Sequence, residues 1–125
     1  MEILGKLIII GGAVDKGSFT ETNLDKDAAK NLNFFETGIL KRIIQESKHK
    51  EQSRIEVITT ASKIPREIGP EYVKAFSYLG ANNADVLYIE KREQANDPEV
   101  LERLKAADVV MFTGGDQLRL TSILG

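Results

Sequence analysis

Apolar residues along the chain alternate between short continuous runs and stripes at helical spacing. The continuous runs are rich in isoleucine, valine and leucine, and polar residues or glycines close them. Such runs are typical of strands that are buried on both faces of a sheet. Strands are therefore expected at residues 6–10, 54–60, 85–89 and 109–113.

Between these runs, apolar residues recur at spacings of three and four, which predicts amphipathic helices. The first two stripes are Leu32, Phe35, Ile39 and Ile43, and Tyr72, Ala75, Phe76 and Leu79. The second helix is expected to have Pro70 near its start and Gly80 at its end. Residues 17–31 are polar and show no period, so this segment is predicted to be a long loop.

Two further helices are expected in the second half of the chain. Asp97 can cap the free N–H groups of a helix in which Pro98 fits the first position and Glu99 complements the helix dipole. The residues expected to face the core from it are Val100, Leu101 and Leu104. A short last helix is predicted at residues 117–124, with Gly125 as its cap.

Strands that alternate with helices imply right-handed crossovers and a parallel sheet covered on both faces, which is an α/β fold. In such sheets ligands bind outside the carboxyl ends of the strands. Gly11 and Gly12 follow the first expected strand, and Gly114 and Gly115 follow the fourth. The two glycine pairs would meet over one crevice if these strands are neighbours. Glycines there allow a sharp turn and leave backbone N–H groups accessible to a ligand.

Composition excludes several classes of protein. The chain has 125 residues, enough for one domain, with 42% hydrophobic and 29% charged residues. Its 19 acidic and 17 basic residues give a formal charge of −2, which argues against a nucleic-acid or membrane-surface role. No apolar stretch is long enough to cross a bilayer, and no signal-peptide pattern is seen. A cytoplasmic domain is therefore expected.

The sequence contains no self-sufficient catalytic, cofactor or metal site. There is no cysteine, and His49 is the single histidine, expected to be a solvated cation at a helix end. Neither glycine pair matches a phosphate-binding motif, and no spacing suggests metal ligands, so no cofactor or metal is predicted. Turn, helical or polar surroundings account for the serines that could act as nucleophiles: Ser18, Ser47, Ser62 and Ser122.

The stretch FTGGDQLRL, together with KLIIIGGAVDK and VITTASKIP, resembles the N-terminal half of cyanophycinases and cyanophycinase-like serine peptidases. The resemblance runs over essentially the whole chain, although Val14 stands where family members commonly have an acid. It implies the class I glutamine amidotransferase-like fold, a flavodoxin-like three-layer sandwich with a mostly parallel sheet. Residues 1–125 would form one partial domain that holds four strands of a larger sheet.

The resemblance also implies a site. The backbone of Gly114, Gly115 and Asp116 would form an oxyanion loop, and Asp116 is also well placed to cap the last helix. Gln117 would face the substrate, together with Gly11 and Gly12. The serine nucleophile and the histidine would lie beyond residue 125. The substrate of the family is a polymer of aspartate with arginine on its side chains, which is released as β-aspartyl-arginine dipeptides.

Three hypotheses follow for this chain. The first is the N-terminal piece of a serine peptidase, which pairs with a missing C-terminal half. The second is a non-catalytic binding module that holds a small anionic or peptide-like ligand between the glycine pairs. The third is a structural half that needs a partner chain or a second copy, because the fourth strand would have an open, apolar edge.

Overall fold

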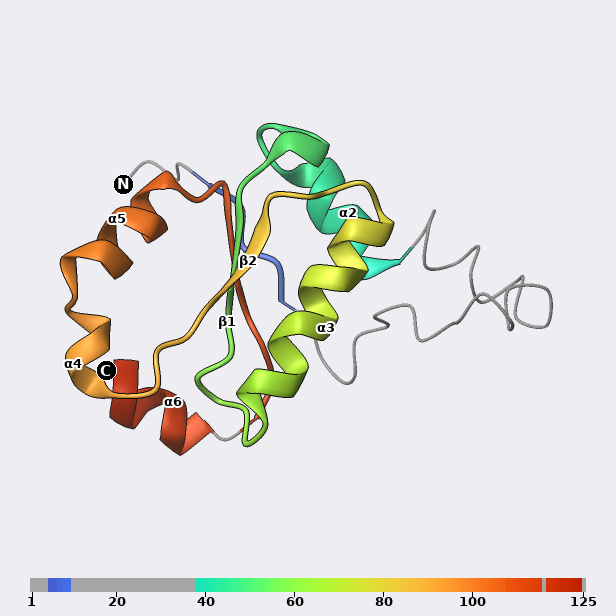
Figure 1. Ribbon diagram of the computed structural model, residues 1–125. Helices are drawn as coiled ribbons and strands as arrows, with labels where there is room; N and C mark the ends of the chain where they lie inside the picture. The colour runs from blue at the N-terminus through green and yellow to red at the C-terminus, as the bar shows by residue number, and fades with distance from the viewer. Residues whose placement is uncertain (1–4, 10–37, 116, 125) are drawn as a thin grey trace, which may run out of the picture.

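The computed structural model of the chain describes residues 5–9, 38–115 and 117–124. Three parallel strands form its sheet, in the order β2-β1-β3 (Figure 1). The strands are β1 (Ile55–Ile58), β2 (Ala84–Leu87) and β3 (Val109–Phe112). Ile55 of the central strand is in register with Ala84 on one side and Val109 on the other.

Helices cover both faces of this sheet, which confirms the predicted α/β, flavodoxin-like sandwich. Figure 1 shows α2 and α3 on one side and α4, α5 and α6 on the other. The helical elements are α2 (Ile39–Glu46), η3 (Lys50–Gln52), α3 (Pro65–Tyr78), α4 (Arg92–Ala95), α5 (Pro98–Ala106) and α6 (Gln117–Leu124). The sequence pattern did not predict the short elements η3 and α4, since neither spans enough turns to show a period.

The central strand β1 is buried along its whole length, as its continuous apolar run predicted. Ile55 and Val57 pack with Phe76 and other side chains of α2 and α3. Ile58 points to the opposite core, which α4, α5 and α6 complete. Full burial of each such side chain contributes about 1.5–3 kcal/mol, so the two small cores together hold the layers on the sheet.

Local capping residues set two helix ends as predicted. Asp97 Oδ1 accepts a hydrogen bond of 2.9 Å from the N–H of Glu99 at the start of α5. Gly80 has φ +89° and follows α3. Its N–H donates to Ser77 O (3.0 Å), and the N–H of Ala81 donates to Phe76 O (2.9 Å), the bonding pattern that a glycine in a left-handed conformation completes.

The predicted start of the second helix was wrong. The helix α3 begins at Pro65, and Pro70 lies inside it. In its first turns only Ile68 among the apolar side chains packs against the core, and Gly69 beside it lies against the sheet, so the apolar stripe is weak there. A Cβ built on Gly69 would lie 2.8 Å from Val86 Cγ2, so the helix approaches β2 too closely for an apolar side chain.

Two further expectations are corrected. Leu101 is 45% exposed, because the face of α5 that packs against the core carries Val100 and Leu104, which are four residues apart and partly buried. Residues 6–9 of the first predicted strand are not in a strand, and Leu7 and Ile9 are 86% and 87% exposed. A hollow separates this segment from β3, so no hydrogen-bonded ladder forms there. Ile10 lies outside the described residues.

Candidate functional site

The carboxyl ends of the three strands lie at one edge of the sheet, at the bottom of Figure 1. We call residues 59–62, which follow β1, the β1 turn, and Gly114–Gly115, which follow β3, the glycine loop. The helix α6 begins at Gln117, directly after this loop. The geometry therefore brings a strand end, a glycine pair and a helix N-terminus together, as the sequence predicted.

The glycine loop rests on the β1 turn by direct backbone contact. Gly115 has φ +149°, a conformation that residues with a side chain rarely adopt. A Cβ built on Gly115 would lie 2.1 Å from Ala61 O and 2.9 Å from Ser62 N. Because both neighbouring atoms belong to the main chain, no side-chain rotation could make room. Only glycine fits at this position.

Gly114 shows the opposite environment. It is exposed, and a Cβ built on it would meet nothing within 4 Å. The residue before it, Thr113, is 6% exposed, and its Oγ1 has no hydrogen-bond partner among the described residues. The chain therefore passes from the buried hydroxyl of Thr113 to the exposed Gly114, and then to Gly115, which packs against the β1 turn.

The other predicted site residues are only partly described. Gln117 is the first residue of α6, but its side chain lies outside the described part of the structure. Asp116, Gly11 and Gly12 also lie outside it, so the predicted meeting of the two glycine pairs stays a prediction. The Gly125 cap of the last helix is likewise outside the described residues.

A charged pair that the sequence analysis missed lies at the same edge. The guanidinium carbon of Arg66 lies 3.8 Å from the centroid of the Tyr88 ring, and Arg66 Nε is 3.2 Å from Glu90 Oε1. These contacts connect the first turn of α3 to the end of β2. The packing of α3 against β2 brings these residues together, and no local sequence pattern predicts such a contact.

His49 lies at the opposite edge of the sheet and not near the glycine loop. Its side chain is 54% exposed, as expected for a solvated residue, and its Nδ1 is 3.0 Å from Asp108 Oδ1, a contact that the sequence did not predict. The N–H of Arg54 donates to Asp108 Oδ2 at 2.9 Å. This backbone hydrogen bond, and then His49, hold the pKa of Asp108 below its usual value. The pair joins the residues that precede β1 and β3.

The serines have structural roles that agree with the sequence analysis at two positions. Ser62 Oγ accepts a hydrogen bond of 3.1 Å from the N–H of Ile64 at the start of α3. Ser122 lies within α6. Ser47 is buried at 6% exposure and not in the expected polar surroundings, and its Oγ donates to Ile44 O at 2.6 Å.

The described residues include no group of three or more side chains that could hold a metal ion. A helix long and apolar enough to cross a membrane is likewise absent from the part of the chain that the structure describes.

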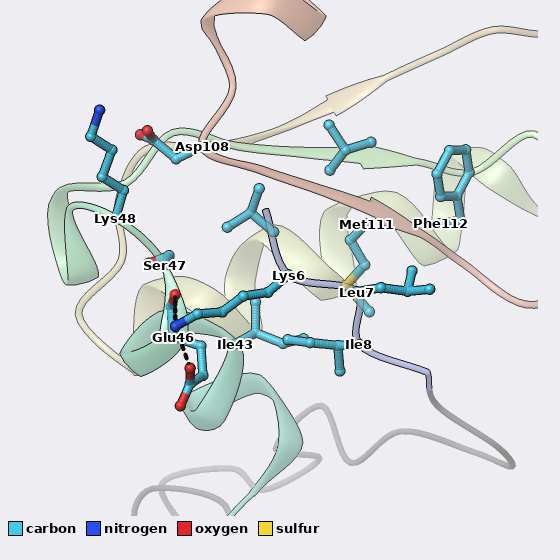
Figure 2. Close-up of a pocket in the computed structure, with 12 residues that line it drawn as sticks. Lys6, Leu7, Ile8, Ile43, Glu46, Ser47, Lys48, Asp108, Met111 and Phe112 are labelled. Carbon is cyan, nitrogen blue, oxygen red and sulfur yellow. Dashed lines mark hydrogen bonds and ion pairs between the residues drawn. The ribbon is translucent and has the colours of Figure 1, made fainter. Parts of the chain in front are cut away.

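A hollow of about 590 Å³ lies along the outer edge of β3 and not at the glycine loop. Figure 2 shows the segment at residues 6–8 on one side of it and Met111 and Phe112 on the other. Lys6 Nζ is 2.6 Å from Glu46 Oε2, and this hydrogen bond lowers the pKa of Glu46. The lining combines aliphatic side chains with charges at one end, which suits an unpaired strand edge better than a reaction centre.

Comparison with proteins of known function shows similarity to cyanophycinases. Over 70 residues, 56% of this chain, it is 41% identical to the cyanophycinase of Trichormus variabilis, of which the match covers 24%. The identity is 40% with the cyanophycinase of Geminocystis herdmanii and 37% with that of Synechococcus elongatus, over 26% and 22% of those proteins. The match spans about a quarter of the length of these relatives. No protein-family model matches the chain.

These comparisons confirm the expected resemblance to cyanophycinases over 56% of the chain, and its expected extension over essentially the whole chain stays a prediction. The relatives are enzymes named for their action on cyanophycin. The α/β fold of this chain, with a glycine loop at the carboxyl edge of a parallel sheet, agrees with that resemblance.

Proposed function

We propose that this chain contributes the oxyanion- and substrate-facing loop of a cyanophycinase-type serine peptidase. The glycine loop supplies backbone N–H groups, and the N-terminus of α6 adds positive potential behind them. When a peptide carbonyl is attacked, negative charge develops on its oxygen, and N–H donors held in place stabilise that oxygen in the transition state. The nucleophilic serine and its histidine base come from a part of the protein beyond residue 125.

One observation carries this proposal. Gly115 is fixed by main-chain contact with Ala61 and Ser62, while Gly114 beside it is open to solvent. A site that stabilises charge needs donors that do not reorganise during the reaction, and it also needs room for the substrate. The glycine loop combines both requirements at the edge where α/β proteins bind ligands.

The finer assignments extend the proposal. The backbone of Asp116 belongs to the oxyanion loop, and Gln117 binds the peptide substrate with an amide that can donate and accept hydrogen bonds. Gly11 and Gly12 approach the same substrate from the N-terminal loop. The substrate is a β-aspartyl-arginine-type peptide, and the protein is expected to work in the cytoplasm without a metal or cofactor.

Hydrolysis of cyanophycin tests the proposal. The protein is produced from its complete gene and incubated with cyanophycin, and mass spectrometry follows the release of β-aspartyl-arginine. The wild type is expected to release the dipeptide. Gly115→Val is expected to release none, because the valine side chain would clash with the backbone of Ala61. Gln117→Ala should lower kcat/KM while the circular dichroism spectrum is kept.

Stability measurements distinguish the structural roles of Gly115 and Gly114. Gly115→Ala should destabilise the fold by about 1–3 kcal/mol, while Gly114→Ala meets open space and should be near neutral. A folded wild-type protein that releases no dipeptide would overturn the proposed function. Calorimetric binding of β-aspartyl-arginine without hydrolysis would point instead to the binding module.

A further inference from the structure

The β1 turn, on which the glycine loop rests, is almost completely buried. The exposed fractions of Thr59, Thr60, Ala61 and Ser62 are 1%, 2%, 4% and 6%. Three of these residues carry hydroxyl groups, and two of the three, Thr60 and Ser62, are the sequence neighbours of Ala61. The carbonyl oxygen of Ala61 is the atom closest to the Cβ position of Gly115. A turn that only connected a strand to a helix would have no need of such burial, since connecting turns lie at the surface.

Hydrogen bonds hold the β1 turn from three directions. Thr60 Oγ1 donates to Ile89 O at 2.8 Å, which ties the turn to the chain just after β2. The N–H of Ser62 donates to Thr59 O at 3.0 Å and closes the turn itself. Ser62 Oγ accepts from the N–H of Ile64 at 3.1 Å and fixes the start of α3.

The glycine loop is also connected to β1 and to the β1 turn. The N–H of Thr113 donates to Ile58 O at 3.0 Å, the residue just before the β1 turn. Gly115 then contacts the turn at Ala61 and Ser62. Any shift of the β1 turn would therefore move the surface on which Gly115 rests, and the direction of its N–H with it.

We propose that the β1 turn is the positioning element of the glycine loop, with Thr60 and Ser62 as its positioning residues. Both residues are almost completely buried, so their role is to position the loop and not to bind substrate. Thr60 sets the distance between the ends of β1 and β2, and Ser62 fixes the turn against α3. The proposal rests on the proposed function of the glycine loop, because it assigns these hydroxyls a role in placing the oxyanion donors.

Thr60→Val gives the most direct test. Valine has nearly the same shape, but it leaves the carbonyl of Ile89 without its hydrogen bond and lets the turn shift. In the complete enzyme, kcat on cyanophycin is expected to fall about 10-fold with KM nearly unchanged, because misplaced donors weaken only the transition state. Thr60→Ser keeps the hydroxyl and should restore most of the rate.

A matched control distinguishes positioning from general stability. Ser77 Oγ also makes a hydrogen bond, to Asn82 Oδ1 at 3.0 Å, but at the far end of α3. Ser77→Ala should leave kcat unchanged. An unchanged kcat in Thr60→Val, or an equal loss of kcat in Ser77→Ala, would overturn the proposal.

A second measurement does not depend on activity. In NMR spectra of the protein produced from its complete gene, a nuclear Overhauser effect is expected between the Hα protons of Gly115 and the amide proton of Ser62. Thr60→Val should weaken this signal and Thr60→Ser should preserve it. An unaltered signal in Thr60→Val would overturn the positioning role. If the complete wild-type enzyme proves inactive on cyanophycin, the proposed function fails, and the NMR comparison still decides the structural inference.

Discussion

Arg103 of α5 reaches the fully buried carboxylate of Glu56 on the central strand. Arg103 Nη2 is 2.5 Å from Glu56 Oε2, and Arg54 also contacts Glu56, with its Nη2 3.0 Å from Oε1. The hydrogen bond that Arg103 donates raises its pKa further above the usual value, so the guanidinium stays charged. A buried charge of this kind requires partners, and α5 is thereby fixed to one position on the sheet.

Removal of the Arg103 partner should destabilise the fold. In Arg103→Met the stem is kept, but Glu56 loses its shortest contact and keeps Arg54 as its remaining cationic partner among the residues that the structure describes. The free energy of unfolding is expected to fall by about 1–3 kcal/mol, less than for a fully isolated buried charge. Urea denaturation measures the change. Lys105→Met on the same helix removes only an exposed contact and should be near neutral; equal effects would contradict the role of Glu56.

The Asp108 carboxylate should make stability depend on pH at the acid end. Its pKa is lowered in the folded state, first by the N–H of Arg54 and then by His49. Its contribution is therefore complete above the ordinary carboxyl pKa of 3.8 and is lost as pH falls through the lower folded value. Asp108→Asn keeps an acceptor for Arg54 but not the charge, so it should lower Tm at pH 7 and reduce the loss of Tm below pH 4.

A matched carboxylate provides the comparison for Asp108. Glu102 is 76% exposed in its side chain and has a single contact with Lys105 at 3.9 Å. Glu102→Gln should leave the dependence of Tm on pH close to that of the wild type. The assignment would be refuted if Asp108→Asn and Glu102→Gln gave the same acid profile.

A side chain at Gly69 should destabilise the fold while Val86 is present. Alanine normally stabilises a helix relative to glycine by about 1 kcal/mol. Here its Cβ would lie 2.8 Å and 2.9 Å from the two methyl carbons of Val86, so Gly69→Ala is expected to destabilise by about 1 kcal/mol. In a Val86→Ala background the same substitution should become stabilising. A double-mutant cycle by thermal denaturation measures this coupling, and additive effects would argue against the contact.

Features that depend on residues close together in the sequence could be predicted, and features that depend on contacts between distant residues could not. Continuous apolar runs predict the strands β1 and β3, and Asp97 predicts the N-terminus of α5. Each of these features depends on residues that are neighbours in the sequence. The contact of Gly115 with Ala61 and that of His49 with Asp108 join distant parts of the chain. No periodicity encodes such contacts, because they arise only when the strands pair. The glycines of the site could therefore be predicted, but not the turn that supports them.

The first predicted strand shows that a local pattern can also predict a strand that does not form. Its apolar run satisfies every local criterion for a buried strand, yet residues 6–9 lie beside β3 without pairing with it. Burial of a strand requires a partner edge at hydrogen-bonding distance, which composition alone does not supply. The exposure of Leu7 and Ile9 is the direct result.

The outer edge of β3 should make the isolated chain associate. Val110 and Phe112 are 39% and 54% exposed, since the core completed by α4, α5 and α6 includes no residue of β3. An apolar strand edge of this kind favours pairing with another chain. Val110→Lys is expected to shift the weight-average mass in light scattering toward the monomer at high protein concentration. Leu101→Lys places the same charge at a similarly exposed apolar residue of α5, away from this edge, and should leave the mass unchanged. A wild-type chain that is monomeric at all concentrations would show that the edge of β3 does not drive association.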